Sequence, residues 1–340
     1  MKKIAFLFTF LLLVVTSAYA QGSQLAVYFI DVGQGDATLI LSGDDIMLVD
    51  TGPDGGLSAL RDQLDSCGVD QIDYLVITHP HEDHDANLAY LADNYAIAHL
   101  VMPEYADDEE DYGSLLREMV GQGTQIVYPN VGDQYAIGEA TATVLSAPDP
   151  GEFPSDENLW SIVLRVDYGE VSVMMTGDAE DINEFAMIDA GLPLGADVLK
   201  VGHHGSNTSS SGTFIDAVSP DCAVVSCGAE NQYGHPHEET LASLEAYGIE
   251  VYRTDLNGSI CLISDGETYK IEPAKELGAQ SADAEDPNEQ TYILNTNTGK
   301  FHYPDCSSVD QMKEKNKREY TGTRDDLIDQ GYDPCGRCKP

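Results

Sequence analysis

The sequence predicts an α/β protein in which two β-sheets pack face to face with helices outside them, followed by a small C-terminal domain. Three observations indicate this architecture. Between residues 25 and 271, short apolar runs rich in β-branched residues alternate with segments of helical periodicity. Side chains that bind metals follow several of these runs, at the strand ends where α/β folds build their sites. Beyond residue 290, three cysteines lie beside a histidine, and a segment of about fifty residues can hardly bury a core without such a staple.

The N-terminus has the pattern of a secretory signal. Lys2 and Lys3 precede an apolar run over residues 4–15, and Ala18-Tyr19-Ala20 follows. A charged segment, an apolar segment and an A-x-A cleavage site predict a Sec signal peptide over residues 1–20. The apolar run is too short for a comfortable transmembrane helix. We therefore expect a secreted or extracytoplasmic protein, with an uncleaved N-terminal anchor as the alternative.

The first half of the large domain opens with strands. Alternation and β-branched residues predict strands at 25–30, 37–41, 45–49 and 72–77. Between them, Leu57, Leu60 and Leu64 recur at helical spacing before Gly68, which predicts a helix over 56–67. A helix at 87–94, a strand at 97–102 and a helix at 114–120 follow. Short strands at 125–128, 134–137 and 140–146 are assigned to the second sheet.

The second half continues the same alternation and then changes character. Strands are expected at 161–166, 171–175, 197–201, 222–227, 250–252 and 259–263, with helices at 181–190, 213–218 and 238–247. Residues 272–290 have almost no large apolar side chains and are rich in Ala, Glu, Asp and Pro. We interpret them as a linker between the large domain, residues 25–271, and a small domain, residues 291–340.

The stretch T-H-P-H-E-D-H-D, from Thr78 to Asp85, carries the clearest chemistry. It follows the apolar strand at 72–77, and four of its side chains are potential metal ligands: His79, His81, Asp83 and His84. Imidazoles with a carboxylate suit zinc, manganese or iron better than calcium or magnesium. A solvated polar turn with incidental histidines is the alternative. Three of the nine histidines of the chain fall in this window, which favours the metal site.

The spacing H-x-H-x-D-H resembles the metal-binding loop of the metallo-β-lactamase superfamily of hydrolases. Six further motifs narrow the resemblance to the hydrolase domain of the ComEC (Rec2) family of competence proteins. In chain order with the metal loop, the motifs are F-I-D-V-G-Q-G-D-A, L-V-D-T-G, T-H-P-H-E-D-H, S-I-V-L-R-V, M-T-G-D, L-K-V-G-H-H-G-S and Y-G-H-P-H. A match of seven motifs in order is far more specific than any one of them.

The resemblance implies an αββα metallo-β-lactamase sandwich with two divalent metals, zinc or manganese. It implies that Asp178 bridges them and that His203 binds the second metal, with His204 or His237 as alternatives for that place. Asp50, at a strand end, either braces the metal loop or caps a turn. The third histidine usual for the first metal is absent, since only His99 lies between His84 and Asp178. In its place the chain offers Asn158 and Ser161.

The same resemblance implies hydrolysis of a phosphodiester in DNA or nucleotides by a metal-activated water. Asp83, or a histidine that binds no metal, would carry the proton, and Ser206 with its neighbouring backbone amides would stabilise the developing oxyanion. Two alternatives remain open. One is a hydrolase of another small substrate, such as a lactone, a β-lactam or a cell-wall phosphodiester. The other is a non-catalytic protein that binds DNA or metal.

The C-terminal domain carries a second set of metal-binding side chains. His302 and Cys306 are four residues apart, and Cys335 and Cys338 form a C-x-x-C pair. Together they make a closed set for one structural zinc ion, while a Cys335–Cys338 redox pair with a free thiol is the alternative. The sequence of this segment resembles the zinc domain of the Ada DNA-repair family, in which a cysteine takes the place of His302. The histidine favours a structural role over methyl transfer.

The net charge of −42 arises from 59 acidic and 17 basic residues among 340. From Tyr292 onward the two kinds balance at eight each, so the excess negative charge lies in the preceding part. An acidic surface repels polyanions, which weighs against tight binding of nucleic acid by that part alone. The seven cysteines are an odd number, so they do not form a simple disulfide framework.

Overall fold

The computed structural model describes residues 24–104, 110–275, 290–304, 306–309, 311–322, 324–329 and 332–339. The chain separates into two compact units, Met1–Leu277 and Gly278–Pro340. The predicted signal peptide, residues 1–20, and most of the predicted linker lie outside the described residues. No helix in the described ranges is long and apolar enough to cross a membrane.

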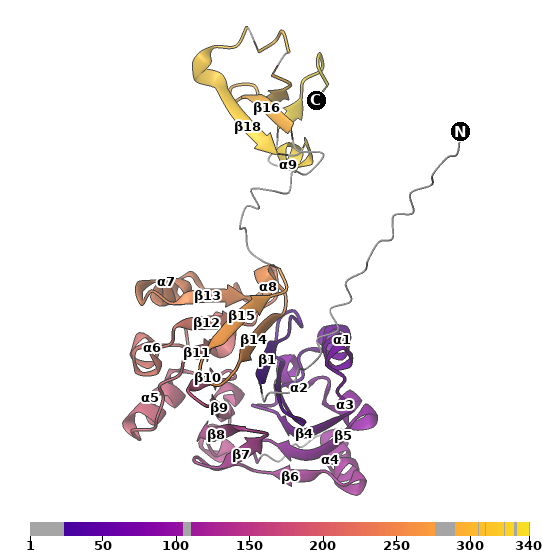
Figure 1. Cartoon of the computed structure of the whole chain (residues 1–340), viewed down its shortest axis with the longest axis vertical. Coiled ribbons are helices and arrows are strands. Elements are labelled where there is room, and N and C mark those ends of the chain that lie inside the picture. Colours follow the sequence, from indigo (N-terminus) through magenta and orange to yellow (C-terminus); the bar gives the residue numbers. More distant parts are fainter. Residues whose placement is uncertain are drawn as a thin grey trace, which may run out of the picture. The chain divides into compact units, whose positions relative to one another are not determined.

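The first unit contains an eight-stranded and a seven-stranded sheet (Figure 1). In spatial order, the first sheet consists of β15 (Tyr269–Pro273), β14 (Ile260–Ser264), β1 (Leu25–Phe29), β2 (Thr38–Ser42), β3 (Asp45–Val49), β4 (Gln71–Val76), β5 (Ala96–Val101) and β6 (Gln125–Val127). The second consists of β13 (Glu250–Arg253), β12 (Cys222–Val225), β11 (Val198–Lys200), β10 (Val171–Met175), β9 (Val163–Tyr168), β8 (Ala140–Ser146) and β7 (Gln134–Ile137).

The core lies between these two sheets. Apolar side chains of β1 to β4 pack against those of β8 to β11, and nearly all are fully buried. Burying one such side chain stabilises the fold by about 1.5–3 kcal/mol. The helices cover the outer faces, because their apolar sides fill two further layers: α1 (Leu57–Cys67), α3 (Leu88–Asn94) and α4 (Glu110–Gln122) on the first sheet, and α5 (Asp181–Asp189), α6 (Gly212–Val218) and α7 (Glu238–Ala246) on the second. The predicted αββα sandwich is therefore confirmed.

One strand was assigned to the wrong sheet. The segment at 125–128 was placed in the second sheet, but β6 pairs in parallel with β5 at the edge of the first sheet. The reason is that β6 follows α4 as a helical crossover, the connection that parallel neighbours require. In addition, β15 extends to Pro273, two residues into the range predicted as linker.

Parallel pairing sets the place of the functional side chains. Val49 of β3 lies opposite Val76 of β4, so the residues that follow both strands, including Asp50 and Thr78, emerge side by side. In the second sheet Met175 of β10 lies opposite Lys200 of β11, which brings Asp178 next to the loop that begins at Gly202. The two sheets thus direct their functional loops to a common edge. There, a Cβ added to Gly177 would lie 2.9 Å from Thr78, so the loops are in close contact.

The second unit has a four-stranded sheet in the order β18 (Lys317–Gly322), β16 (Gln290–Asn295), β17 (Lys300–His302) and β19 (Asp333–Pro334), with the helix α9 (Arg324–Asp329). Its apolar core is small and consists of Tyr292, Leu294, Phe301 and Leu327. Such a core supports the expectation that a further element stabilises this unit.

Candidate active site

Three strand ends supply the site of the first unit. The metal loop follows β4, Thr176-Gly177-Asp178 follows β10, and the loop at 202–211 follows β11. His203 and His204 both adopt left-handed backbone angles, with φ of 48° and 53°. Non-glycine residues in this conformation store strain, and such strain occurs mainly at functional sites.

Two groups of potential metal ligands meet at Asp178. The first consists of His79, His81 and Asp178, whose ligand atoms lie within 4.8 Å of one another. His79 Nε2 is 2.9 Å from His81 Nδ1 and 3.8 Å from Asp178 Oδ2. His79 and Asp178 are buried, whereas the His81 side chain is 38% exposed. The group therefore opens to solvent on the side of His81.

The second group consists of Asp36, His84, Asp178 and His204, all buried and again within 4.8 Å. His84 Nε2 is 3.2 Å from Asp178 Oδ1, and His204 Nε2 is 3.5 Å from Asp178 Oδ2. Asp83 lies beside this group, with its Oδ2 3.2 Å from His204 Nε2. Asp178 is thus common to both groups, with one oxygen toward each of His84 and His79.

Buried hydrogen bonds orient the histidine rings. His84 Nδ1 is 2.9 Å from Asp50 Oδ2, which also accepts the hydroxyl proton of Thr78 at 2.9 Å. His79 Nδ1 is 3.1 Å from Thr78 Oγ1, and His204 Nδ1 is 3.0 Å from the carbonyl oxygen of Ser226. Because these partners accept protons from Nδ1, the Nε2 atoms of all three rings keep their lone pairs for a metal.

The buried charges strongly shift the ionisation of these groups. Burial raises the pKa of Asp178, but the adjacent His204 and His84 outweigh it and hold that pKa well below the usual range. Burial lowers the pKa of His84 and of His204, but Asp178 with Asp50 or Asp36 raises both well above the usual value. The buried carboxylates therefore favour positive charge in this cluster, whether as a proton on an imidazole or as a cation.

The residues fit divalent cations. Three buried atoms that face the centre, His84 Nε2, His204 Nε2 and Asp178 Oδ1, make no hydrogen bond with any described residue. Such unpaired buried atoms are costly unless a ligand satisfies them. Mixed imidazole and carboxylate donors suit zinc, manganese or iron.

The other predicted residues lie around these groups in different ways. Ser161 Oγ accepts the backbone N–H of Asp178 at 3.1 Å, and Asn158 lines the pocket with a weak contact to Glu180. His203 sits at the rim, 3.7 Å from Asp178 Oδ2, so the buried position in the second group belongs to His204. Ser206 Oγ shares a hydrogen bond with Thr208 Oγ1 of the same loop.

His237 lies outside the pocket. It is the N-cap residue immediately before α7, and its Nδ1 accepts the backbone N–H of Asn207 at 3.0 Å. The histidine that lines the pocket from this loop is His235, two residues earlier. The motif Y-G-H-P-H contains both histidines, and its spacing alone does not distinguish them.

Sequence reasoning missed Asp36 and Lys200. The buried ammonium group of Lys200 forms an ion pair with Asp36, whose other oxygen is 3.5 Å from His204 Nδ1. Burial raises the pKa of Asp36, but Lys200 and His204 lower it further, below its usual value. The signals were an acid in a glycine-rich turn and a lysine at the end of a buried strand, which is rarely the place for an unpaired charge.

An open cavity of about 310 Å³ leads to both groups. Its lining combines ligand candidates with amide and aromatic side chains: Gln34, His81, Glu82, Asp83, Asn158, Asp178, His203, His204, Tyr233 and His235. The volume is that of a small-molecule site or of one segment of a longer chain.

Residues 30–229 match the Metallo-beta-lactamase superfamily. The chain belongs to this superfamily. Its hydrolase fold and its competence-protein resemblance, both predicted from the motifs, are confirmed, and the fold implies divalent metals. The prediction of a metal-dependent hydrolase is thereby also confirmed.

Curated relatives include members of the ComEC family of competence proteins. The chain is 34% identical over 260 residues to ComE operon protein 3 of Bacillus subtilis, covering 70% of this chain and 33% of the relative. It is 33% identical over 242 residues to Competence protein ComA of Neisseria gonorrhoeae, covering 70% and 32%. The chain therefore spans about a third of the length of the curated relatives it matches.

Solved structures share the fold at low identity. YhfI, a metallo-β-lactamase fold protein from Bacillus subtilis, aligns with a TM-score of 0.50 and 16% identity, over 71% of this chain and 100% of that one. CmlA, a diiron β-hydroxylase from Streptomyces venezuelae, aligns with a TM-score of 0.51 and 16% identity, over 71% and 54%. These similarities concern the fold alone.

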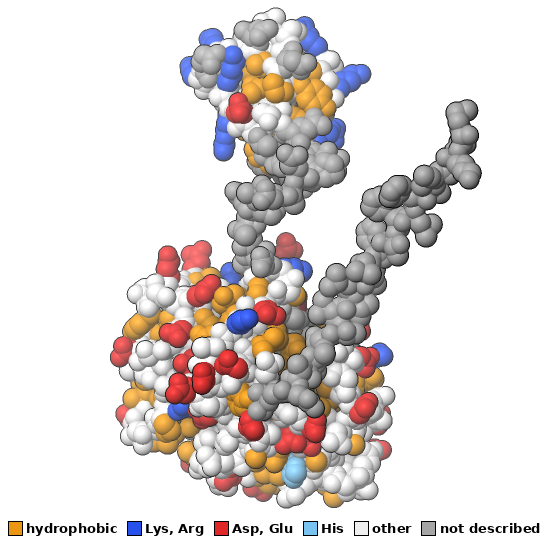
Figure 2. Space-filling model, viewed as in Figure 1, with side chains coloured by type: hydrophobic (Ala, Val, Ile, Leu, Met, Phe, Trp, Pro, Cys, Tyr) orange, Lys and Arg blue, Asp and Glu red, His pale blue; other side chains and the backbone are white. Residues whose placement is uncertain are grey.

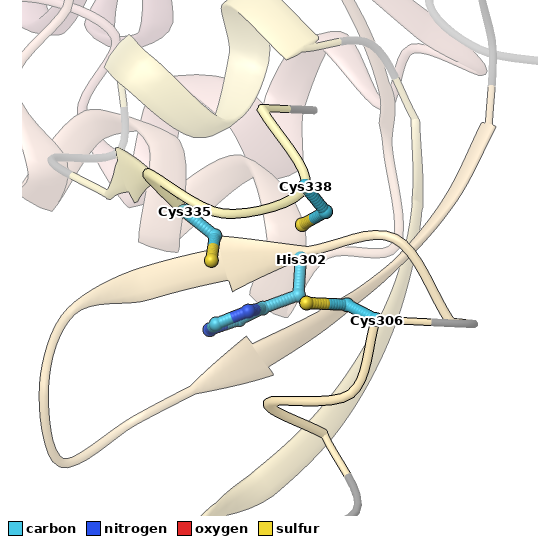
Figure 3. Close-up of side chains that lie close together, drawn as sticks. All are labelled: His302, Cys306, Cys335 and Cys338. Atoms are coloured by element: carbon cyan, nitrogen blue, oxygen red, sulfur yellow. The ribbon is translucent and has the colours of Figure 1, made fainter.

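The second unit brings its four predicted ligands together. The ligand atoms of His302, Cys306, Cys335 and Cys338 lie within 4.8 Å of one another, and Figure 3 shows the four side chains converging. His302 Nδ1 is buried without a hydrogen-bond partner among the described residues. Burial alone would raise the pKa of Cys335, but the backbone amides of Cys338 and Arg337 bring it to about 7. Three sulfurs and one imidazole fit a tetrahedral zinc ion.

Proposed function

We propose that this chain is an exported phosphodiesterase that hydrolyses DNA or nucleotides with two divalent metal ions, zinc or manganese. Three findings support the proposal: membership of the superfamily, relatives that are named as competence proteins, and the arrangement around Asp178. Asp178 is the observation that carries it. One carboxylate shared by two groups of ligands is the geometry expected of a dinuclear site.

His79 and His81 would hold the first ion, and His84 with His204 the second, with Asp178 between them. When bound, two such cations lower the pKa of a water molecule and neutralise charge on a phosphoryl group. The chain itself positions the substrate and moves the proton. Asp83 Oδ2, on a side chain that is 29% exposed, faces the cavity and is placed to accept a proton from the attacking water.

The cavity rim supplies donors for the substrate. His203 Nδ1 lies 3.4 Å from Glu180 Oε1, which orients the ring, and Nε2 lies 3.7 Å from Asp178 Oδ2 at the lining of the cavity. An imidazole in this place donates a hydrogen bond to a non-bridging phosphate oxygen. Burial of Asp36, Asp178 and His204 keeps bulk water away from the base of the site.

The two units differ in surface charge. Figure 2 shows acidic side chains spread over the visible face of the first unit, whereas basic and acidic residues balance at eight each from Tyr292 onward. An acidic body discourages non-specific binding of a polyanion, whereas basic side chains neutralise phosphates. We assign the second unit the role of a handle for nucleic acid, with one structural zinc ion on His302, Cys306, Cys335 and Cys338.

Metal analysis and hydrolysis of the full chain test the main proposal. We expect two equivalents of Zn or Mn that depend on Asp178 and His81, and cleavage of DNA and of a generic phosphodiester that is lost by more than roughly 100-fold in Asp178→Asn and His81→Ala. His99→Gln is the matched control, because His99 stacks on Tyr74 away from the site.

Three outcomes would contradict the proposal. Full turnover in Asp178→Asn would remove the bridging carboxylate from the reaction. Hydrolysis of a lactone or β-lactam without any phosphodiester cleavage would establish the alternative substrate class. Stoichiometric metal binding without hydrolysis of any of these compounds would establish the non-catalytic alternative.

A separate measurement tests the second unit. Cys335→Ser should release one equivalent of zinc and weaken the binding of labelled DNA, while the metals on His79, His81, His84 and His204 remain. Retention of all zinc in this variant would exclude a zinc site on these four side chains.

A further inference from the structure

An exposed aromatic pair forms one wall of the active-site cavity. Tyr233 is 56% exposed although its ring borders the pocket. Its ring stacks on His235, with ring centres 5.7 Å apart and planes inclined by only 21°. Exposure of a large ring at the mouth of a site, with one face already supported, leaves the other face available for a planar ligand.

The loop that carries this pair is held by one amide side chain. Asn231 Oδ1 accepts the backbone N–H groups of Tyr233 and His235 at 3.1 and 3.0 Å. Asn231 Nδ2 donates to the carbonyl oxygens of Gly228 and His235. Four hydrogen bonds from one side chain fix the loop in advance, so little conformational entropy is lost when a ligand binds.

The same loop is tied to a free amide donor across the cavity. Gln34 Oε1 accepts the backbone N–H of Gly228 at 3.1 Å, and a Cβ on Gly228 would approach the Gln34 backbone nitrogen to 2.7 Å. Gln34 Nε2 is buried, borders the cavity and has no hydrogen-bond partner among the described residues. An amide fixed at its oxygen and unpaired at its nitrogen is a donor awaiting an acceptor.

The aromatic pair adjoins the metal-ligand groups. The His235 ring lies 5.4 Å from the ring of His203 and 6.1 Å from that of His204. The Tyr233 ring is thus connected to these histidines through His235, and it lines the same cavity.

We infer that Tyr233 and His235 form a stacking shelf for an unpaired nucleobase next to the scissile phosphodiester, and that Gln34 Nε2 donates to an oxygen of the same nucleotide. This inference rests on the proposed phosphodiesterase function and names its substrate class as single-stranded nucleic acid or nucleotides. A base inside a duplex is stacked on both faces and cannot reach the shelf without leaving the helix. Aromatic stacking tolerates all four bases, so the shelf selects for single strands and not for sequence.

The test compares an oligothymidylate with a single-stranded oligomer of the same length that carries abasic sugars. The readout is the ratio of kcat/KM for the first substrate to kcat/KM for the second. Tyr233→Leu should lower this ratio roughly 5- to 100-fold, mainly through KM, since stacking of one base on an aromatic ring has that strength. Tyr233→Phe should keep the ratio. Tyr247→Leu is the matched control, because Tyr247 is also exposed but contacts Gly212.

Binding to the full chain provides a second readout that does not depend on turnover. Fluorescence anisotropy of labelled oligothymidylate should show a weaker Kd for Tyr233→Leu by the same factor, and thermal unfolding should show that the variant remains folded. An unchanged ratio in Tyr233→Leu, or a loss equal for both substrates, would overturn the shelf while leaving the phosphodiesterase intact. Failure of the parent chain to cleave either oligomer would overturn the proposed function and the shelf with it.

Discussion

The replacement Asp50→Asn tests how the carboxylate behind the metal loop controls the site. Asp50 Oδ1 accepts the backbone N–H of Thr78 at 2.8 Å, and Oδ2 faces both Thr78 Oγ1 and His84 Nδ1 at 2.9 Å. Asparagine keeps one acceptor for the backbone but presents an NH₂ group to the other two atoms. His84 must then accept at Nδ1 and carry its proton on Nε2, the atom that faces Asp178.

The magnitude follows from what is lost. Loss of a partner that fixes a ligating histidine usually weakens metal affinity by roughly 10- to 100-fold. A donor facing a donor in a buried site costs about 1–3 kcal/mol of folding free energy. We therefore expect the second metal to bind 10- to 100-fold more weakly at about neutral pH, with a lower Tm for the apo form.

A competition titration against a chromophoric chelator measures the affinity, and denaturant unfolding measures the stability. Asp73→Asn is the matched control. The Asp73 carboxylate also accepts a backbone N–H, from Ile46 at 2.8 Å, but it touches no histidine side chain of the site. Metal affinity in Asp50→Asn that equals that of Asp73→Asn would refute the role of Asp50 in setting the tautomer.

Three further changes test the fold around the site. Lys200→Met leaves Asp36 buried without its cation and should lower the free energy of unfolding by about 3–5 kcal/mol, measured with denaturant. Adding Asp36→Asn in the same chain should restore much of this loss. A loss below about 1 kcal/mol would contradict the buried ion pair. Gly205→Ala should destabilise by more than Gly191→Ala, since both have positive φ but only at Gly205 would a Cβ meet Pro236, at 2.5 Å; equal Tm values would show that the loop gives way. Burial raises the pKa of Glu184, so the folded state binds the proton of this carboxyl more tightly than the unfolded state does. The stability of the parent relative to Glu184→Gln should therefore fall as the pH rises above the ordinary glutamate pKa. A stability difference that does not change with pH would contradict this sign.

The sandwich was predictable because its strands carry a local signal. Runs such as 45–49, 134–137 and 171–175 are apolar, bounded by turn residues and observed with those bounds. The order of strands within a sheet is a different matter, since β6 at 125–127 has the same local pattern whichever sheet it joins. Pairing depends on the crossover through α4 and on contacts distant in sequence, which a local pattern does not record.

In the candidate site, too, the sequence predicted what depends on local spacing and missed what depends on contacts distant in sequence. The compact spacing of His79, His81 and His84, and the resemblance that pointed to Asp178, gave these candidates, and the structure brings their ligand atoms together. Asp36 and Lys200 were missed because each is unremarkable alone and acquires meaning only when the fold buries them together, 164 positions apart in the chain. His204 is buried whereas His203 lies at the rim, and His235 lines the cavity whereas His237 does not. These positions depend on left-handed backbone angles and on loop hydrogen bonds that spacing does not determine.

The close contact of Gly177 with Thr78 has a mechanical consequence. The histidines of the metal loop follow a strand of one sheet and Asp178 follows a strand of the other, so cations bound among them would cross-link the two sheets. Separation of the sheets on unfolding would then require that these cations dissociate, and the Tm should rise with the concentration of free metal.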